Sequence, residues 1–305
     1  MRYLVTGAAG FVGSHLAEAL AAGGHDVVGL DCLTDYYDPA LKEENARGIL
    51  LERDDLAGDP LDFSGFDGVF HLAGQPGVRS FGDVFPLYLR RNVLATQRVF
   101  EAAAAAGARV VFASSSSIYG AAERYPTPED TVPAPLSPYG VTKLACEQLA
   151  RAYAKGFGLD AVVLRYFTVY GPRQRPDMLF SRVVNALASA GAIEIYGGGD
   201  QSRSFTYVGD AVDATIAAMD AAPAGAVYNV GGGEEATVLE AIALLERISG
   251  RTLDVRRTQA AAGDVSRTAA DVTRIAAELG WTARTPLEEG LKAQWEWAAA
   301  RVAAG

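Results

Sequence analysis

The fold is set by the stretch at residues 3–13, which reads Tyr-Leu-Val-Thr-Gly-Ala-Ala-Gly-Phe-Val-Gly. Its apolar start predicts a buried strand, and the apolar periodicity from about residue 11 to residue 22 predicts a helix. Three glycines, Gly7, Gly10 and Gly13, occupy the turn between them. They permit a tight turn, close approach of the backbone to a pyrophosphate and close packing of the helix, whose N-terminus faces the phosphates. The spacing Gly-x-x-Gly-x-x-Gly differs from the simplest dinucleotide fingerprint, so the motif needs support from its surroundings.

An acidic residue supplies that support. The apolar run at residues 26–30 predicts a second strand, which ends in Asp31. A carboxylate at this place can bind the ribose hydroxyls of adenosine, and it repels a 2'-phosphate. The sequence therefore predicts a site for NAD rather than NADP. The first cofactor-binding residues are Gly7, Gly10, Phe11, Val12, Gly13 and Asp31.

Strand and helix patterns continue to alternate through the first half of the chain. Apolar strands at residues 68–72 and 109–113 flank a helical segment from about residue 85 to residue 106. This alternation predicts an α/β fold with a parallel, doubly wound sheet, whose ligands bind at the carboxyl ends of the strands. Further cofactor contacts are expected at Leu72, Ala73, Gly74, Asp55, Leu56 and Asn92. A purely structural role fits Asn92 equally well, and Asp55 also suits a solvated acidic loop.

The stretch Ser-Pro-Tyr-Gly-Val-Thr-Lys at residues 137–143 carries a candidate for acid–base chemistry. A helix that begins near Pro138 places Tyr139 and Lys143 one turn apart on the same face. A phenol is a poor base at neutral pH, and a fixed ammonium beside it favours the phenolate. Tyr139 is therefore the expected base and Lys143 its electrostatic support, and an exposed helix start is the alternative.

Four consecutive serines, at residues 114–117, follow the buried strand that ends near residue 113. A hydroxyl at the carboxyl end of a strand can converge with the tyrosine and the lysine over a nicotinamide. A serine-rich loop without chemistry is the alternative.

Composition argues against several other kinds of site. The formal net charge of -10 over 305 residues argues against binding to nucleic acid or to an anionic membrane. Two cysteines and three histidines without ligand spacing argue against a disulfide framework or a metal site. No apolar run approaches the roughly 18 residues of a membrane span, and Met1 leads almost directly into a strand, without room for a signal peptide. We therefore expect a cytoplasmic protein.

Taken together, these motifs resemble the extended short-chain dehydrogenase/reductase family, in its nucleotide-sugar epimerase branch. The resemblance rests on residues 7–13, Asp31, residues 71–74, the serine-rich strand end, residues 139–143 and residues 164–172. It implies a Rossmann domain that holds NAD tightly, at residues 1–165, and a smaller nucleotide-sugar-binding α/β domain at residues 166–305. The boundary is approximate, because the chain is expected to cross back.

The same resemblance implies that Ser115 acts with Tyr139 and Lys143 in catalysis. It also implies a homodimer, formed through helices at around residues 90–106 and 138–156.

Two residues in the second half are candidates for binding a nucleoside diphosphate. Arg203 follows a strand and a glycine-rich turn, and a guanidinium pairs bidentately with phosphate. An exposed salt bridge is the alternative for Arg203. Asp264 occupies a position that, by resemblance, binds the ribose of uridine. We therefore expect a UDP-sugar as the substrate.

The two residues after Ser115 indicate which reaction the family chemistry would lead to in this chain. In the family, the position of Tyr139 takes the proton of the sugar 4-hydroxyl while hydride passes from C4 to NAD, which gives a 4-keto sugar. Family members that then eliminate water carry an Asp-Glu pair where this chain has Ser116 and Ser117. Hydroxyl groups cannot replace that acid and base, which leaves 4-epimerisation or loss of a 6-carboxylate.

The neutral donors Ser116, Ser117 and Thr168 suit a carboxylate, since charge-assisted hydrogen bonds are the stronger ones. Resemblance to UDP-glucuronate 4-epimerases adds the substrate contacts Arg175, Gln75 and Arg79. We therefore expect interconversion of UDP-glucuronate and UDP-galacturonate through a transient 4-keto sugar, with NAD recycled in each turnover. The alternatives are 4-epimerisation of UDP-glucose and UDP-galactose, decarboxylation of UDP-glucuronate, and a protein that binds NAD without catalysis.

Overall fold

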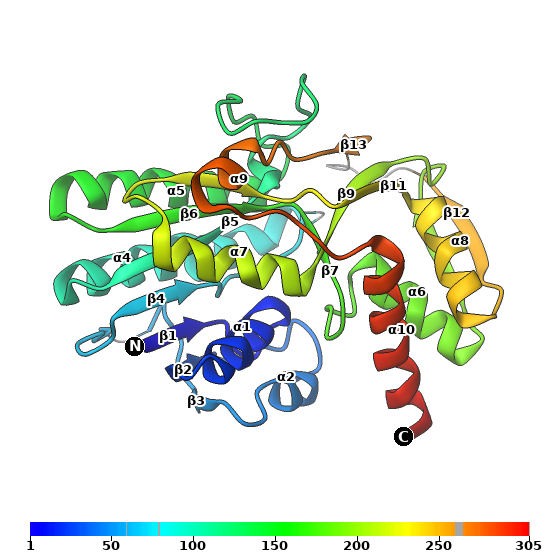
Figure 1. Ribbon diagram of the computed structural model, residues 1–305, viewed down its shortest axis with the longest axis horizontal. Coiled ribbons are helices and arrows are strands. Elements are labelled where there is room, and N and C mark those ends of the chain that lie inside the picture. The colour runs from blue at the N-terminus through cyan, green and yellow to red at the C-terminus, as the bar shows by residue number, and fades with distance from the viewer. Residues whose placement is uncertain (59, 79, 260–264, 305) are drawn as a thin grey trace.

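A parallel sheet forms the centre of the computed structural model, which describes residues 1–58, 60–78, 80–259 and 265–304 (Figure 1). Within these residues the sheet has seven strands, in the order β10 (Val227–Val230), β6 (Ala161–Tyr166), β5 (Arg109–Ser115), β4 (Gly68–His71), β1 (Arg2–Thr6), β2 (Asp26–Leu30) and β3 (Leu50–Glu52). The order reverses at β1, as in other doubly wound sheets that bind dinucleotides. The predicted α/β fold class is therefore confirmed.

Helices cover both faces of this sheet. The helices and helical turns around it are α1 (Phe11–Ala22), α2 (Pro39–Asn45), α3 (Phe85–Tyr88), the π-helical turn η2 (Leu89–Leu94), α4 (Ala95–Ala106), α5 (Pro138–Phe157), α7 (Val208–Ala221) and α9 (Thr273–Leu279), with the short turns η1 (Gly82–Val84) and η3 (Ser116–Ile118). Helices α1 and α7 pack together on one face, and α4 and α5 pack together on the other (Figure 1).

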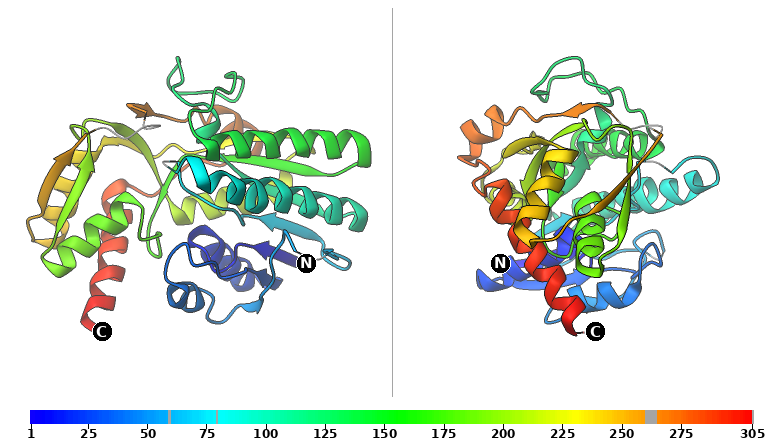
Figure 2. Two further views of the ribbon diagram at one scale, coloured as in Figure 1. Left: turned by 180° about the vertical axis from the view of Figure 1, so that it is seen from behind. Right: turned by 90° about the vertical axis from the view of Figure 1, so that its right-hand side faces the viewer.

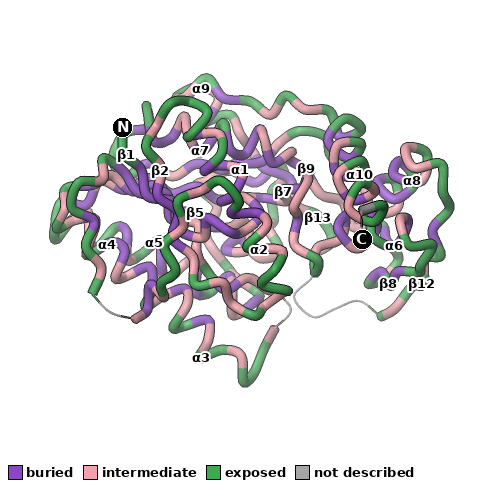
Figure 3. The backbone as a smooth tube through the Cα atoms, turned by 90° about the horizontal axis from the view of Figure 1, so that it is seen from below, coloured by how far each residue is buried: buried purple, intermediate pink, exposed green. Residues whose placement is uncertain are grey.

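Strand β1 shows why these strands read as nearly continuous apolar runs. Successive side chains of a strand point to opposite faces of the sheet. Tyr3 and Val5 pack into the core beneath α1 and α7, whereas Leu4 packs into the core beneath α4 and α5. Both faces are therefore buried, and Figure 3 shows the strands enclosed between the helices.

The smaller half of the molecule lies beyond the carboxyl ends of the large sheet (Figure 1). Its strands are β7 (Thr168–Tyr170), β9 (Ser202–Tyr207), β11 (Glu234–Thr237) and β13 (Arg267–Thr268) in one sheet, and β8 (Ala192–Tyr196) with β12 (Asp254–Thr258) in another. Its helices are α6 (Leu179–Ser189), α8 (Val238–Ser249) and α10 (Leu287–Ala304). These three helices pack against one another around a separate apolar core (Figure 2).

The chain passes back from the smaller half to the large sheet. Strand β10 pairs with β6, and α7 packs against α1, although both elements come from residues 166–305. The division at residue 165 therefore stays a prediction about where a domain boundary falls.

None of the described helices is long and apolar enough to cross a membrane. Over the same residues, no group of three or more His, Cys, Asp and Glu side chains could hold a metal ion.

Candidate active site

The glycine-rich turn follows β1 and forms one wall of a cavity. Gly7 has a φ of 72°, which favours glycine, and its N–H donates to the Leu30 carbonyl at 2.8 Å. A Cβ on Gly13 would lie 2.1 Å from the Gly7 oxygen, so only glycine lets α1 approach the turn this closely. Helix α1 has Gly10 as its N-cap, which leaves its first N–H groups without a side-chain cap. The turn therefore fits the pyrophosphate of a dinucleotide.

Asp31 braces this turn from the end of β2. Its carboxylate accepts hydrogen bonds from the N–H groups of Ala9 at 3.2 Å and Leu33 at 2.8 Å. Each oxygen keeps a further lone pair, which can accept a ribose hydroxyl. The cavity beside Asp31 brings together almost all the other predicted cofactor residues. They are Gly7, Gly10, Phe11, Val12, Gly13, Asp55, Leu56, Leu72, Ala73, Gly74, Tyr139 and Lys143.

The loop after β2 also lines this cavity, and sequence analysis missed it. The cavity is lined by Thr34, Tyr36 and Tyr37 of this loop and by Lys42 of helix α2. The Lys42 ammonium donates to the Thr34 carbonyl at 2.5 Å and to the Thr34 hydroxyl at 2.8 Å, and burial lowers the pKa of Lys42. Two adjacent tyrosines so soon after Asp31 were the signal that could have revealed the loop, since aromatic rings are large apolar groups that favour burial.

Asn92 lies behind the cavity and is buried. Its side-chain oxygen accepts from the Gln75 N–H at 2.6 Å, and its side-chain nitrogen donates to the Gln75 carbonyl at 3.1 Å. The same nitrogen donates to the Thr142 hydroxyl at 3.0 Å. The π-helical turn η2 therefore ties the segment after β4 to helix α5, close to Lys143.

Helix α5 presents the tyrosine and the lysine. Ser137 caps the helix by accepting a hydrogen bond from the Gly140 N–H at 3.1 Å. Lys143 is buried, and its ammonium donates to the Ala113 carbonyl at 2.7 Å. That ammonium lies 5.9 Å from the centroid of the Tyr139 ring. The positive charge and the phenol therefore lie together beside the carboxyl end of β5.

The four serines divide between the core and the cavities, because alternate side chains of a strand face opposite ways. Ser114 is buried and its hydroxyl donates to Glu147 at 2.5 Å, although Ser114 also borders the cofactor cavity. The Ser115 hydroxyl accepts from the Ser117 N–H at 3.1 Å and donates to the Ser117 hydroxyl at 3.0 Å. A second cavity is lined by Ser115, Ser116, Ser117 and Tyr139.

A buried ion pair supports this strand end from behind. The side chains of Glu147 and Arg165 are only 2% and 3% exposed, and Arg165 donates to the two Glu147 oxygens at 3.1 and 2.8 Å. Arg165 also donates to the Tyr119 hydroxyl at 2.7 Å. Since Glu147 holds Ser114, the helix that carries the tyrosine also fixes the strand end that carries Ser115.

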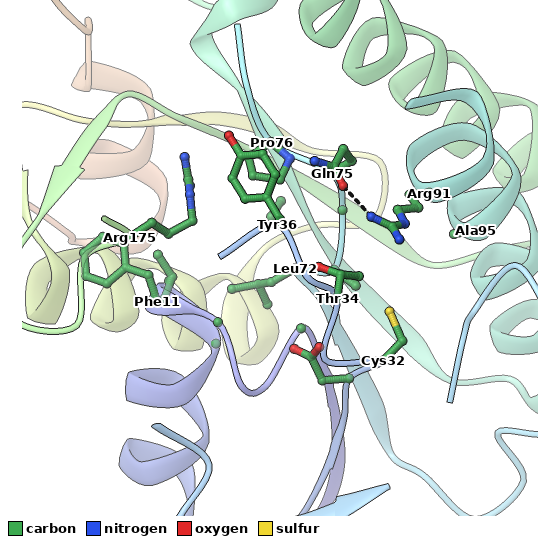
Figure 4. Close-up of a pocket in the computed structure, with 18 of the residues that line it drawn as sticks. Phe11, Cys32, Thr34, Tyr36, Leu72, Gln75, Pro76, Arg91, Ala95 and Arg175 are labelled. Carbon is green, nitrogen blue, oxygen red and sulfur yellow. Dashed lines mark hydrogen bonds between the residues drawn. The ribbon is translucent and has the colours of Figure 1, made fainter. Parts of the chain in front are cut away.

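The second cavity meets the cofactor cavity at Tyr139 and collects the predicted sugar contacts. Thr168 lines the second cavity, and Arg175 lines both. Figure 4 shows Arg175 and Tyr36 projecting from separate segments into the pocket. The Arg175 guanidinium donates to the two Asp177 oxygens, each at 3.0 Å, and the Tyr36 hydroxyl donates to Asp177 at 3.3 Å. Arg175 therefore faces the cavity as a member of an ion pair.

The remaining predicted substrate residues lie in different places. Gln75 lines the cofactor cavity and accepts from Arg91 at 2.8 Å (Figure 4). Arg203 lines the second cavity and donates to the Val265 carbonyl at 2.8 Å. Two predicted residues, Arg79 and Asp264, lie outside the described residues.

The loop at residues 171–177, which carries Arg175, is held from both halves of the molecule. On one side, Arg173 pairs with Glu18 of α1 at 2.8 Å. On the other side, Gln294 of α10 accepts a hydrogen bond from the first N–H group of the loop at 3.1 Å. Arg173 has a φ of 62°, which is uncommon for a residue with a side chain. The loop therefore connects the helix of the glycine turn with the second cavity.

Known proteins resemble the chain in sequence and in fold. Residues 3–231 match the model of the NAD dependent epimerase/dehydratase family. The chain is 42% identical to the uncharacterized UDP-glucose epimerase YtcB of Bacillus subtilis (strain 168), over 95% of this chain and 96% of that protein.

Two solved structures resemble the chain along nearly its whole length. The UDP-glucuronic acid 4-epimerase from Bacillus cereus, in complex with UDP-glucuronic acid and NAD, is 38% identical, with a TM-score of 0.95 over 99% of this chain and 100% of that one. MoeE5, in complex with UDP-glucuronic acid and NAD, is 45% identical, with a TM-score of 0.90 over 99% of this chain and 100% of that one. MoeE5 has also been solved with UDP-glucose and NAD.

Proposed function

Because the chain belongs to the NAD dependent epimerase/dehydratase family, we propose that it is an NAD-dependent epimerase that interconverts UDP-glucuronate and UDP-galacturonate. The choice of UDP-glucuronate as the substrate rests on the side chains around the second cavity. The hydroxyl groups of Ser116, Ser117 and Thr168 line the same cavity as Tyr139 and the Arg175 guanidinium. Such a group of donors suits a carboxylate on the sugar.

The residues around the first cavity fit NAD. The turn at Gly7 and Gly13 leaves no room for a side chain where a pyrophosphate would approach, and Asp31 suits the adenosine ribose. A nicotinamide held there would supply reversible hydride transfer at the sugar C4. Tyr139 would take the proton of the 4-hydroxyl and give it back, and Lys143 would stabilise the phenolate. Ser115 would hydrogen-bond the same sugar oxygen.

The serines after Ser115 favour epimerisation over elimination of water and over decarboxylation. Ser116 and Ser117 offer neither the acid nor the base that elimination of water needs. A 4-keto sugar that carries a 6-carboxylate loses CO₂ when the bond to the carboxylate lies along the carbonyl π system. Hydrogen bonds from the hydroxyl groups of Ser116, Ser117 and Thr168 would hold the carboxylate near the ring plane. The intermediate would then turn over in the site and be reduced on its other face.

A product assay tests this proposal. The purified protein is incubated with UDP-glucuronate and, separately, with UDP-glucose, and products are identified by chromatography and mass spectrometry. We expect a product of unchanged mass from UDP-glucuronate, and none in the Tyr139→Phe variant. A product lighter by one CO₂ would make the protein a decarboxylase and overturn the proposal.

Epimerisation of UDP-glucose is the second candidate. YtcB carries the name of a UDP-glucose epimerase, and MoeE5 has been solved with UDP-glucose as well as with UDP-glucuronic acid. The product assay separates the two, since turnover of UDP-glucose alone would favour this candidate. A protein that binds NAD without catalysis is less consistent with the site, because Ser115, Tyr139 and Lys143 lie together in it.

We further propose that the protein acts as a homodimer in the cytoplasm. Large apolar side chains are exposed along α3, η2 and α5, which contact one another: Phe85 is 38% exposed, Leu89 43% and Val141 47%. Burial of these side chains against a second copy would remove them from water. Light scattering should give the mass of two chains, and Val141→Glu should shift the protein toward one chain. A wild-type monomer at high concentration would contradict the dimer.

A further inference from the structure

Helix α2 forms part of the wall of the cofactor cavity. Its Lys42 side chain is 5% exposed, lines the cavity and donates to Thr34 of the preceding loop at 2.5 and 2.8 Å. The Asn45 side chain is 8% exposed and donates to the Ala9 carbonyl of the glycine-rich turn at 3.3 Å. The position of α2 therefore determines how closely the cavity wall encloses a cofactor.

Polar contacts, and not an apolar core, hold this helix in place. It has seven residues, all described by the structure, and the two that are buried, Lys42 and Asn45, are both polar. Helices as short as this are not stable on their own. Segments that bury little apolar surface open locally at a low cost in free energy. A movement of α2 away from the glycine-rich turn would therefore open the cavity unless another part of the molecule opposes it.

Helix α10 of the smaller half supplies such a contact. Near its end, Arg301 forms an ion pair with Glu44 of α2. The Arg301 guanidinium also lies over the Trp297 ring, 5.1 Å from its centroid, which restricts its orientation. The hydrogen bond from Arg301 is the main cause that lowers the pKa of Glu44, so this carboxylate is charged at neutral pH. Figure 1 shows α10 running from the smaller half to the level of α2.

The helix that carries Arg301 is itself firmly anchored. Leu291 and Ala298 belong to the apolar core of the smaller half. Gly290 approaches Tyr170 so closely that a Cβ there would lie 2.2 Å from the tyrosine oxygen. Arg301 follows Ala298 by three residues, which is less than one helical turn. The ion pair therefore joins a helix that is weakly held, α2, to one that is packed into a core.

We propose that Arg301 holds α2 against the cofactor cavity and thereby slows the release of NAD. Arg301 is a positioning residue, because it acts through Glu44 and α2 and is not among the residues that line either cavity. The proposal goes beyond the proposed function: it concerns retention of the cofactor and holds whichever UDP-sugar is epimerised.

The rate of NAD release from the Arg301→Gln variant tests this proposal. Protein loaded with NAD is mixed with an excess of deuterium-labelled NAD, and the replacement of bound NAD is followed by mass spectrometry. Release should be about twofold to fivefold faster than from the wild type, the range expected for one half-exposed ion pair. High salt should bring the wild-type rate toward that of the variant, since the contact is electrostatic. An unchanged rate in the variant would overturn the proposal.

The partner residue gives an independent test of the same contact. Glu44→Gln should speed the release of NAD as much as Arg301→Gln does. The double variant should release NAD no faster than either single variant, because each substitution already removes the whole interaction. Effects that multiply in the double variant would show that the two residues act separately, and would also overturn the proposal.

A second arginine supplies a matched control. Arg274 forms an ion pair with Glu278 on α9 and lies over the Tyr228 ring, 5.2 Å from its centroid. The exposed fractions of its pair, 42% and 39%, are close to the 32% and 38% of Arg301 and Glu44. Arg274→Gln removes the same charge from the chain and should leave the rate of NAD release unchanged. A similar acceleration in this control would mean that the loss of charge alone is responsible, and would contradict the role of α2.

Hydrogen exchange separates this role from a merely structural one. If Arg301 only stabilised α10, its replacement would speed exchange in α10, lower the melting temperature and leave α2 unchanged. The proposal instead predicts faster exchange at the amides of residues 40–45 in cofactor-free Arg301→Gln than in the cofactor-free wild type. Equal exchange there would overturn it. No sugar enters these measurements, so a failure of the proposed function would leave their outcome unaffected.

Discussion

Replacing Glu147 by Gln removes one charge from the buried pair with Arg165 and keeps the size of the side chain. The Glu147 side chain is 2% exposed, and its two oxygens accept from Arg165 at 3.1 and 2.8 Å. One of them also accepts from Ser114 at 2.5 Å. The variant leaves the guanidinium buried with a neutral partner.

The expected loss of folding stability follows from the burial of this pair. Removal of one partner from a buried ion pair destabilises a protein by about 3–5 kcal/mol, because the other charge stays out of water without compensation. A loss of this size is a large share of the about 5–15 kcal/mol that holds a typical domain folded. At about 2–4 °C per kcal/mol, we expect the melting temperature to fall by roughly 6–20 °C.

Thermal unfolding followed by circular dichroism measures this effect. The exposed pair of Arg53 and Glu43, at 3.0 Å, is the control, and Glu43→Gln should cost less than about 1 kcal/mol. The double variant Glu147→Leu with Arg165→Met removes both charges and should recover at least half of the lost stability. A fall of less than about 2 °C in Glu147→Gln would refute the reasoning, since it would mean that Arg165 is solvated or has another anionic partner.

Two further predictions test the cofactor side of the site, and a third tests a buried histidine of strand β4. Gly13→Ala places a methyl group 2.1 Å from the Gly7 oxygen, so this variant should purify without NAD, and a full NAD content would contradict the close approach of α1. Asp31→Asn removes the charge that repels a 2'-phosphate, so titration of the cofactor-free variant should show at least about tenfold less discrimination against NADP. Burial lowers the pKa of His71 to about 3, well below the value of about 6.5 in an unfolded chain. The unfolded chain therefore binds the extra proton, and this contribution to stability is complete above about pH 6.5 and is lost as the pH falls toward 3. Urea unfolding should show about 2 kcal/mol less stability at pH 5 than at pH 7, a difference that His71→Gln should reduce and that would be absent if His71 were solvated.

Local patterns predicted the parts of the molecule that neighbouring residues determine. The glycine turn and the pair Tyr139 and Lys143 depend on steric limits and helical spacing within a few residues, so their geometry follows from the sequence. The opposite orientations of Ser114 and Ser115 could also be deduced from the sequence, because neighbouring side chains of a strand point to opposite sides.

The same local patterns could not predict contacts between distant segments of the chain. No local rule brings Tyr36 to Asp177, which lies 141 positions away, or adds β10 to the sheet beside β6. The surroundings of Arg175 illustrate the difference. Its partner Asp177 lies only two residues away, but Tyr36, which also donates to Asp177, comes from the loop after β2.

The loop at residues 171–177 makes the two halves of the molecule depend on each other. Through Arg173 and Glu18 it is fastened to helix α1, which begins at the cofactor, and through Gln294 it is fastened to the last helix of the smaller half. Because the same loop contacts both sides, we expect a substitution that shifts it to alter sugar choice to change the retention of NAD as well. Exchange of the smaller half between relatives would therefore transfer a change in cofactor retention along with the new pocket, unless the contact with α1 is exchanged too.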